Sequence, residues 1–316
     1  MLALKEVSGE AVTGTASPAI HTVELRKAFG KTVALAGLSM TVPPGEVFGF
    51  LGPNGAGKTT SVKLLLGLIK PTGGEAWILG QPIGDLKTRA RIGYLPELFR
   101  YQGWLSAREV LAVHCELARL PGSTWIDEIR SALHTVGLAD RADDKVTTYS
   151  KGMQQRLGLG AALLGKPELI FLDEPTSALD PVGRHDVREI IRKLAERGTA
   201  VFLNSHLLSE VEQVCDRVAV VDHGRVIKSG TMDELLGGSA VRVRATGLST
   251  SNLQSLASYG EIDDEGDHLT FNGLSPDRVP DLVAEIVRIG GRVYAVEPRH
   301  QTLEDRFLQL LRDEDK

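Results

Sequence analysis

The chain has 316 residues, of which 42% are hydrophobic and 24% charged, proportions that allow one large globular domain and a smaller one. The net charge of −5 is spread without a basic block, which argues against nucleic acid as the main partner. Two cysteines fit a reducing compartment. No apolar run approaches a membrane span, and the N-terminus lacks a signal-peptide core. We therefore expect a cytoplasmic protein, whose membrane role would come through a partner.

The organisation changes several times along the chain. Residues 1–20, rich in Ser, Thr, Gly and Ala, are expected to form a loose extension. From residue 21 to about 92, separate short strand-type runs, 33–35 and 38–42 among them, alternate with turns. Residues 98–148 favour helix, with a capping box at Ser106 and Glu109. Residues 150–236 return to alternating strands and helices, which is the pattern of a parallel α/β sheet.

The C-terminal part is predicted to be a separate small α+β domain. Its expected elements are a strand at 241–245, a helix at 252–259, a hairpin at 261–271 turning on residues 264–267, a helix at 280–289 and a strand at 292–297. This βαββαβ order predicts a ferredoxin-like unit. The expected divisions are 1–20 for the extension, 21–238 for the main domain and 239–316 for the accessory domain.

Residues 52–60 satisfy the phosphate-loop pattern Gly-x-x-x-x-Gly-Lys-Ser/Thr. An apolar strand leads into the loop and a helix at 60–69 follows, so that backbone N–H groups and a helix N-terminus face an anion. Lys58 is expected to reach the β- and γ-phosphates and the Thr59 hydroxyl to bind Mg²⁺. A glycine-rich turn that binds nothing is the alternative, and the flanking elements count against it. The residues expected to bind a nucleoside triphosphate are Gly52, Pro53, Asn54, Gly55, Ala56, Gly57, Lys58, Thr59 and Thr60.

A second apolar strand, at residues 169–172, ends in the adjacent carboxylates Asp173 and Glu174. Apolar strands that end in acidic residues are mostly structural. In a chain with a phosphate loop, however, the Mg²⁺ of the nucleotide needs an oxygen ligand at a strand terminus. Asp173 is the expected ligand, directly or through water. Glu174 points elsewhere and is expected to polarise the water that attacks the γ-phosphate.

Further segments make the chain resemble the ABC ATPases. Residues 149–156, Tyr-Ser-Lys-Gly-Met-Gln-Gln-Arg, resemble the signature motif of that family, and residues 177–180, Ser-Ala-Leu-Asp, resemble its D-loop. His206, after a predicted strand, resembles the switch histidine, and Phe29 stands where the family places an aromatic ring against adenine. The motifs cover roughly residues 21–236. The resemblance implies a P-loop NTPase fold with a β subdomain, an α/β core and a helical subdomain.

The resemblance also implies an ATPase that uses ATP and Mg²⁺ and works as an ATP-dependent homodimer. Two copies would pair head to tail, with Ser150, Lys151 and Gly152 of one copy facing the phosphate loop of the other. His206 would hold the γ-phosphate. Asp180 would lie at the dimer interface and also cap the helix that begins at the next residue.

Some positions depart from the family pattern. The signature carries Tyr149, Lys151 and Met153 instead of the commoner Leu, Gly and Gln, while its two phosphate-facing residues are retained. Glu97 stands where most relatives have glutamine, in the loop that senses Mg²⁺ and water and signals to the membrane subunit. Its carboxylate can accept hydrogen bonds and approach Mg²⁺ but cannot donate.

The Tyr-Leu-Pro-Glu segment ending at Glu97 and the closing segment at 295–308 resemble the ABC ATPases that serve drug and antibiotic exporters. The implied protein is a peripheral subunit on the inner face of the cell membrane, which hydrolyses ATP to power a separate multi-spanning permease. It would dock through residues 98–148 and the Glu97 loop. The tail would support the dimer or regulate it, with a purely stabilising cap as the alternative. Two alternatives remain. One is an importer motor, and the other is a non-transport ABC ATPase acting on ribosomes or DNA.

Overall fold

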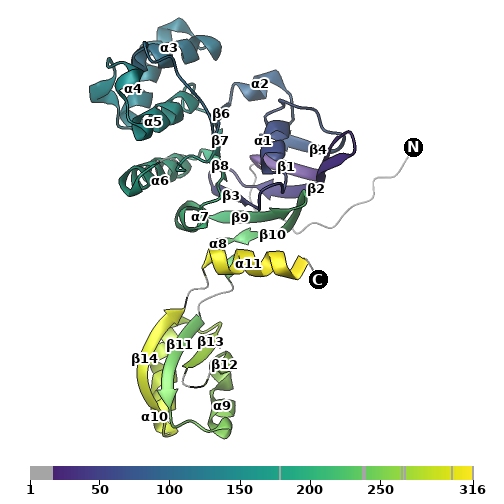
Figure 1. The fold of residues 1–316 in the computed structure, drawn as a ribbon, viewed down its shortest axis with the longest axis vertical. Coiled ribbons are helices and arrows are strands. Elements are labelled where there is room, and N and C mark those ends of the chain that lie inside the picture. Colours follow the sequence, from purple (N-terminus) through teal and green to yellow (C-terminus); the bar gives the residue numbers. More distant parts are fainter. Residues whose placement is uncertain are drawn as a thin grey trace.

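The computed structural model describes residues 17–177, 179–236, 240–264, 266, 268–299 and 302–314. Figure 1 shows a large unit of sheets and helices with a small sheet-and-helix unit beyond it. The expected extension at 1–20 lies mostly outside the described residues, and strand β1 already begins at Ile20. Across the described ranges, no helix is long and apolar enough to cross a membrane.

The large unit begins with a four-stranded antiparallel sheet in the order β2-β1-β4-β5. The two runs expected at 33–35 and 38–42 are one continuous strand, because pairing with β1 continues on both sides of the Ala36-Gly37 step. The separate-strand prediction was therefore wrong at this point. The strands are β1 (Ile20–Phe29), β2 (Thr32–Val42), β4 (Gly73–Ile78) and β5 (Gln81–Pro82).

A six-stranded sheet in the order β10-β9-β3-β8-β7-β6 forms the centre of the large unit. Its strands pair in parallel except for β10, which forms an antiparallel hairpin with β9. Every residue of β3, β7 and β8 is buried, as expected of parallel strands covered on both faces. The strands are β3 (Val47–Leu51), β6 (Ile92–Leu95), β7 (Leu169–Asp173), β8 (Ala200–Asn204), β9 (Arg217–Asp222) and β10 (Arg225–Thr231).

Helices α1 (Lys58–Leu65), α6 (Pro181–Glu196) and α7 (Leu208–Val214) accompany this sheet (Figure 1). The helix expected at 60–69 ends at Leu65, and Gly67 follows with a φ of +65°, so this boundary was predicted too long. Gly67 terminates the helix, because it adopts the left-handed conformation and its N–H donates back to the carbonyl of Leu64.

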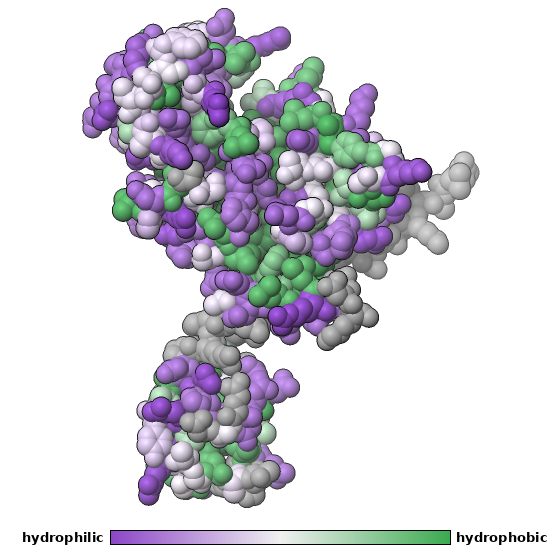
Figure 2. All heavy atoms as spheres, viewed as in Figure 1, coloured by the Kyte–Doolittle hydropathy of each residue, from purple (hydrophilic) through white to green (hydrophobic). Residues whose placement is uncertain are grey.

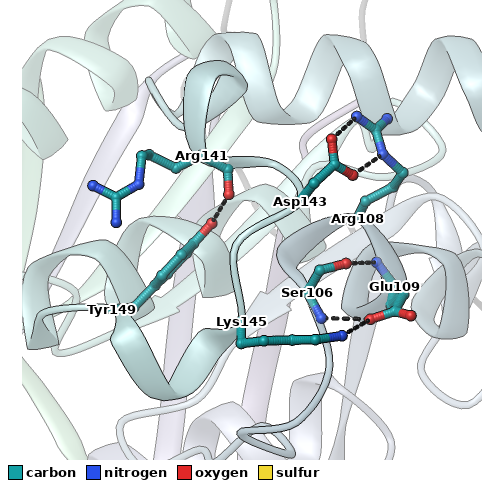
Figure 3. Close-up of polar contacts among 7 residues, drawn as sticks. All are labelled: Ser106, Arg108, Glu109, Arg141, Asp143, Lys145 and Tyr149. Carbon is teal, nitrogen blue, oxygen red and sulfur yellow. Dashed lines mark hydrogen bonds and ion pairs between the residues drawn. The ribbon is translucent and has the colours of Figure 1, made fainter.

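Residues 98–148 are mainly helical, as predicted. Beyond the short α2 (Leu86–Arg89) lie α3 (Ala107–Leu117) and α4 (Trp125–Thr135), and α5 (Lys151–Ala162) completes the group. The predicted capping box is confirmed: the Ser106 Oγ accepts from the Glu109 N–H at 3.2 Å, and the Ser106 N–H donates to Glu109 Oε2 at 2.6 Å (Figure 3).

The small unit has the strands and helices expected from the sequence, with shifted ends. Its four-stranded sheet has the order β12-β13-β11-β14, with antiparallel neighbours throughout. Part of the expected hairpin turn, Glu265 and Asp267, lies outside the described residues. The elements are β11 (Ala240–Thr246), α9 (Thr250–Leu256), β12 (Glu261–Asp264), β13 (His268–Asn272), α10 (Val279–Arg288) and β14 (Arg292–Arg299).

One helix, α11 (Leu303–Glu314), was not anticipated and returns the chain to the large unit (Figure 1). Leu303 is fully buried in the large unit's core, and its N–H donates to Glu212 Oε2 on α7 at 2.9 Å. Arg306 Nε donates to the carbonyl of Leu235 on α8 (Met232–Leu236) at 3.1 Å. The range 239–316 therefore includes a helix that packs on the larger unit.

Candidate nucleotide-binding site

The predicted phosphate loop connects β3 to α1 and is pressed against neighbouring backbone. A Cβ on Gly52 would lie 2.3 Å from the carbonyl oxygen of Val221, and one on Gly57 would lie 2.5 Å from that of Ala34. Gly57 also caps α1 with a φ of +98°, which L side chains rarely adopt. Both positions therefore require glycine, and the loop turns tightly enough to present backbone N–H groups at the start of α1.

Lys58, the first residue of α1, extends its side chain back over the loop. Its Nζ donates to the carbonyl oxygens of Gly52 at 2.7 Å and Pro53 at 3.1 Å. Burial lowers the pKa of Lys58, while the charges of Glu174 and Asp173 act in the opposite direction. The lysine is thus a half-buried cation that faces the two carboxylates predicted from the sequence.

Asp173 ends β7 and is 5% exposed. Asn204, at the end of the neighbouring strand β8, donates from Nδ2 to Asp173 Oδ1 at 2.5 Å. Burial raises the pKa of Asp173, and the Glu97 and Glu174 charges add to that effect. Asn204 was missed in the sequence, although a polar residue closing an apolar strand was a usable signal. Its Oδ1 is buried without a hydrogen-bond partner among the described residues.

Glu174 and His206 are in direct contact. Glu174 has a φ of +53°, a conformation uncommon outside glycine, and its N–H donates to the carbonyl of Asn204 at 2.8 Å. The Glu174 Oε2 lies 2.8 Å from His206 Nδ1, and its Oε1 accepts from the His206 N–H at 2.9 Å. Only 10% of the Glu174 side chain is exposed, against 60% for His206. The histidine ring therefore lies between the carboxylate and solvent.

The predicted signature lies at the start of α5. Ser150 caps that helix, its Oγ accepting from the Met153 N–H at 3.2 Å. Tyr149, which replaces a commoner leucine, is 5% exposed and donates from its hydroxyl to the Arg141 carbonyl at 2.6 Å (Figure 3). Among the described residues, no hydrogen bond or ion pair joins Ser150, Lys151 or Gly152 to the Lys58 and Glu174 cluster. Within one chain the signature and the loop thus form two separate surfaces.

A second set of contacts holds the segment leading into the signature (Figure 3). Arg108 of α3 donates from Nε to Asp143 at 2.7 Å, and Lys145 lies 3.2 Å from Glu109. These pairs tie residues 141–149 to the start of α3. The signature helix is therefore positioned by the helical part of the large unit.

Three further predicted residues, Asp180, Phe29 and Glu97, belong to other elements of the large unit. Asp180 caps α6, as predicted, accepting from the Gly183 N–H at 2.7 Å, while Ala178 of the same motif lies outside the described residues. Phe29 ends β1 with half its surface exposed, and the Lys27 Nζ lies 4.8 Å from its ring centroid. Glu97 is exposed after β6, close enough to Asp173 to affect its pKa.

The donor set fits magnesium bound together with a nucleotide. No cluster of three His, Cys, Asp or Glu side chains in the described part of the chain could hold a metal by itself. Mg²⁺ commonly uses one or two carboxylates and completes its shell with phosphate oxygens and water. Asp173 supplies such a carboxylate. Burial raises its pKa, and an opposite charge nearby would favour the ionised form.

Comparison with known proteins places these motifs in one family. The family model described as ABC transporter matches residues 35–177. The daunorubicin/doxorubicin resistance ATP-binding protein DrrA of Streptomyces peucetius is 40% identical, over 72% of this chain and 70% of its own length. The Nod factor export ATP-binding protein I of a Rhizobium strain is 35% identical, over 92% of this chain and 96% of its own length. The solved structure of cbiO1 from Clostridium perfringens, part of the ABC transporter complex cbiONQ, is 28% identical with a TM-score of 0.63, over 69% of this chain and 90% of its own.

Proposed function

Since this chain belongs to the ABC transporter ATP-binding proteins, whose ATPase domain binds and hydrolyses ATP, we propose that it powers a separate multi-spanning membrane subunit for export. The cargo class would be a small molecule, drug or lipid-like compound, because drug resistance and Nod factor export stand in the relatives' names. The protein would act on the inner face of the cell membrane. The main support is the grouping of Lys58, Asp173, Glu174 and His206 at one edge of the parallel sheet.

The proposed roles follow from charge and position. The loop from Gly52 to Thr60 cradles the phosphates, Lys58 neutralises charge on the β- and γ-phosphates, and Phe29 stacks on adenine. Thr59 and Asp173 would hold Mg²⁺, with Glu97 near enough to assist. The ion would supply charge neutralisation between the phosphates. Asn204 orients the Asp173 carboxylate through its 2.5 Å hydrogen bond.

Glu174 is proposed as the general base. Glu174 directly follows β7, and the 2.8 Å contact with the His206 ring holds its carboxylate in one orientation. A base must lie within hydrogen-bond reach of the attacking water. A fixed carboxylate at the edge of the sheet that carries the phosphate loop meets that need. His206, whose ring is exposed, would turn to the γ-phosphate when the nucleotide binds.

We propose that hydrolysis needs two copies of the chain. Ser150, Lys151 and Gly152 form the N-terminus of α5, where the helix dipole and a lysine favour an anion. They make no described contact with Lys58 or Glu174 of the same chain. A γ-phosphate held between this helix and the partner's loop would draw two copies together, with Asp180 at their interface.

The membrane subunit is proposed to dock in a groove of about 1000 Å³ between α2, the segment after β6, α3 and α5. In Figure 2 the surface is hollowed between the helices α3–α5 and the part that carries α2. Arg89, Arg100 and Arg119 line the groove, and no Asp or Glu does so among the described residues. In a chain of net charge −5, this local excess of positive charge fits an acidic amphipathic segment.

The test combines activity with partner capture. Tagged Glu174→Gln protein would be held with Mg-ATP in gently solubilised cells of its own source, and mass spectrometry would identify the retained proteins. A multi-spanning membrane protein in near-equal amount supports the proposal, and Arg100→Glu should reduce its capture. Ribosomal or DNA-bound partners without a membrane protein would contradict transport.

A further inference from the structure

A pocket of about 380 Å³ lies at the opposite edge of the six-stranded sheet from the nucleotide-binding residues. Its lining includes Glu168 and Thr199, which directly precede β7 and β8, whereas Asp173 and Asn204 end those strands. Since β7 and β8 are parallel, their starts share one edge of the sheet and their ends share the other. The remaining walls are α4, the link between α5 and β7, and the end of α6 (Figure 1). The pocket lining includes none of the residues proposed to bind ATP or Mg²⁺.

The floor of this pocket is apolar. Ala132 and Leu194 belong to the core of the large unit and are 4% and 7% exposed. Leu163 and Pro167 complete the apolar lining. Sites for small molecules are mostly apolar, with a few polar groups that fix the orientation of the ligand, and this volume is at the lower end of their range. The floor therefore suits the hydrocarbon part of a small ligand.

The two acidic residues of the pocket already have partners. Glu128 Oε2 accepts from the Gly165 N–H at 3.1 Å, and the Glu128 side chain is 15% exposed. Glu168 accepts from Arg91 through both carboxylate oxygens, at 2.6 Å each. Arg91 does not line the pocket, so it neutralises Glu168 from outside. A ligand would thus meet carboxylates that are already engaged.

The two basic residues of the pocket are less engaged. Lys166 Nζ lies 3.9 Å from Glu128 Oε1, at the outer limit of an ion pair, and its side chain is 84% exposed. Arg197 is exposed, and its side chain makes no hydrogen bond or ion pair with any described residue. One of the two acids is neutralised from outside the pocket, while neither base is. The rim therefore carries an excess of positive charge.

We propose that this pocket binds a small organic anion, with a carboxylate at the rim and an apolar body on the floor. The carboxylate can accept from the guanidinium of Arg197, whose planar fork matches its two oxygens. The hydroxyls of Ser131 and Thr135, which are neighbours on one face of α4, line the same pocket and can also donate to it. A cationic ligand would instead be repelled by Arg197 and Lys166.

A bound anion would link two helices of the large unit. It would touch α4 on one side and the end of α6 on the other, and so should slow amide exchange at residues 128–135 and 194–199. Helix α4 packs on α5, which begins with the signature, and α6 begins directly after Asp180. The inference goes beyond the proposed function, because such a ligand would act on both helices without competing with ATP.

The test is a fluorine NMR titration of the full-length protein with para-trifluoromethylbenzoate. Saturating Mg-ADP is present throughout, so that Lys58 and the phosphate loop are not open to the probe. A Kd on the order of 1 mM is expected for a ligand of this size. The neutral para-trifluoromethylbenzamide and the cationic para-trifluoromethylbenzylamine have the same apolar body, and each should bind at least about threefold more weakly.

Two substitutions in the pocket test its charge and its space. Arg197→Gln removes the uncommitted cation and should weaken benzoate binding at least about threefold. Lys193→Gln, the loss of an exposed cation on α6 outside the pocket, is its control and should leave the Kd unchanged. Ser131→Trp fills the pocket from α4 and should abolish binding. His134→Trp, at an exposed position of α4 that does not line the pocket, is the control for bulk.

Amide exchange locates the bound probe. Slower exchange at residues 128–135 and 194–199 of the wild type, lost in Ser131→Trp, supports the inference. Absence of benzoate binding, equal binding of the benzamide, or displacement of the benzoate by added ADP would each overturn it. Arg197→Gln and Lys193→Gln with the same Kd, at unchanged melting temperatures, would overturn it as well.

Discussion

The Glu174 carboxylate is held on both oxygens by one residue, since Oε2 lies 2.8 Å from the His206 ring and Oε1 accepts from the His206 N–H at 2.9 Å. Two strands bring these residues together, because Glu174 follows β7 and His206 follows β8, its parallel neighbour. Any rotation of the His206 ring toward a bound phosphate would change the surroundings of the carboxylate. The position of Glu174, the proposed base, is therefore linked to that of His206, the residue proposed to hold the γ-phosphate.

Replacement of Glu174 by glutamine should separate binding from hydrolysis. The amide is nearly isosteric but cannot accept a proton from water, so steady-state ATPase should fall by roughly 10²–10⁴-fold while ATP still binds. Phosphate release and nucleotide-binding assays on the purified protein measure the two effects. The matched control is Glu196→Gln, the same chemical change at an exposed position at the end of α6. Unchanged turnover in Glu174→Gln would remove Glu174 from the role of base.

Asp173 should limit the stability of the nucleotide-free protein. Its pKa is raised by burial, so the folded state binds the proton more tightly than the unfolded state does. Stability should then fall as pH rises from the ordinary Asp value through the raised one, and the cost persists at neutral pH. Asp173→Asn removes the charge and keeps an oxygen for Asn204. We expect the melting temperature at pH 7 to rise by about 2 °C or more, with loss of Mg²⁺-dependent ATPase.

Calorimetry at a series of pH values tests whether the charge of Asp173 destabilises the folded protein. The difference in melting temperature between Asp173→Asn and the wild type should shrink as the pH approaches the ordinary pKa of aspartate, where the wild-type carboxyl is protonated. Asp277→Asn, at an exposed position, serves as the control. A variant less stable than the wild type at neutral pH would show that Asp173 is stabilising and would contradict the assigned effect of burial.

Tyr149 should stabilise the segment before the signature through its hydroxyl. Phenylalanine at this position keeps the buried ring but leaves the Arg141 carbonyl without its 2.6 Å donor. The loss should cost about 1 kcal/mol and speed amide exchange in residues 141–150. Hydrogen exchange followed by mass spectrometry measures it locally. Tyr294→Phe, at an exposed tyrosine of β14, should leave exchange in that segment unchanged.

The local features of the site could be predicted from the sequence because they depend on contiguous residues. The capping box of Ser106 and Glu109 and the cap at Asp180 each lie within four residues and were both found. Asn204 was missed because its partner Asp173 is 31 positions away, and only the parallel pairing of β7 and β8 brings them together. The merging of two expected strands into β2 likewise depends on pairing with β1.

The docking of α11 could not be predicted from the sequence either, because it depends on residues that are far apart in the chain. Its apolar residues were read as part of a closing segment, and nothing near them in the sequence indicates which surface they cover. Leu303, Phe307 and Leu310 pack against the core of the large unit, after the intervening small unit. The carboxylate that receives the Leu303 N–H, Glu212, is 91 positions away. Such a contact follows from the tertiary fold and not from periodicity.

Docking of α11 on the large unit depends on Leu303. Leu303 is fully buried between α11 and the large unit, so Leu303→Ala should remove packing and leave a cavity, at a cost of about 2–5 kcal/mol. Because α11 contacts α7, which begins shortly after His206, the same change should also loosen the His206 segment. Urea unfolding measures the first effect and amide exchange at residues 206–214 the second. Leu308→Ala, 46% exposed on the same helix, should cost less than about 1 kcal/mol. Equal effects from the two variants would mean that α11 does not dock through Leu303.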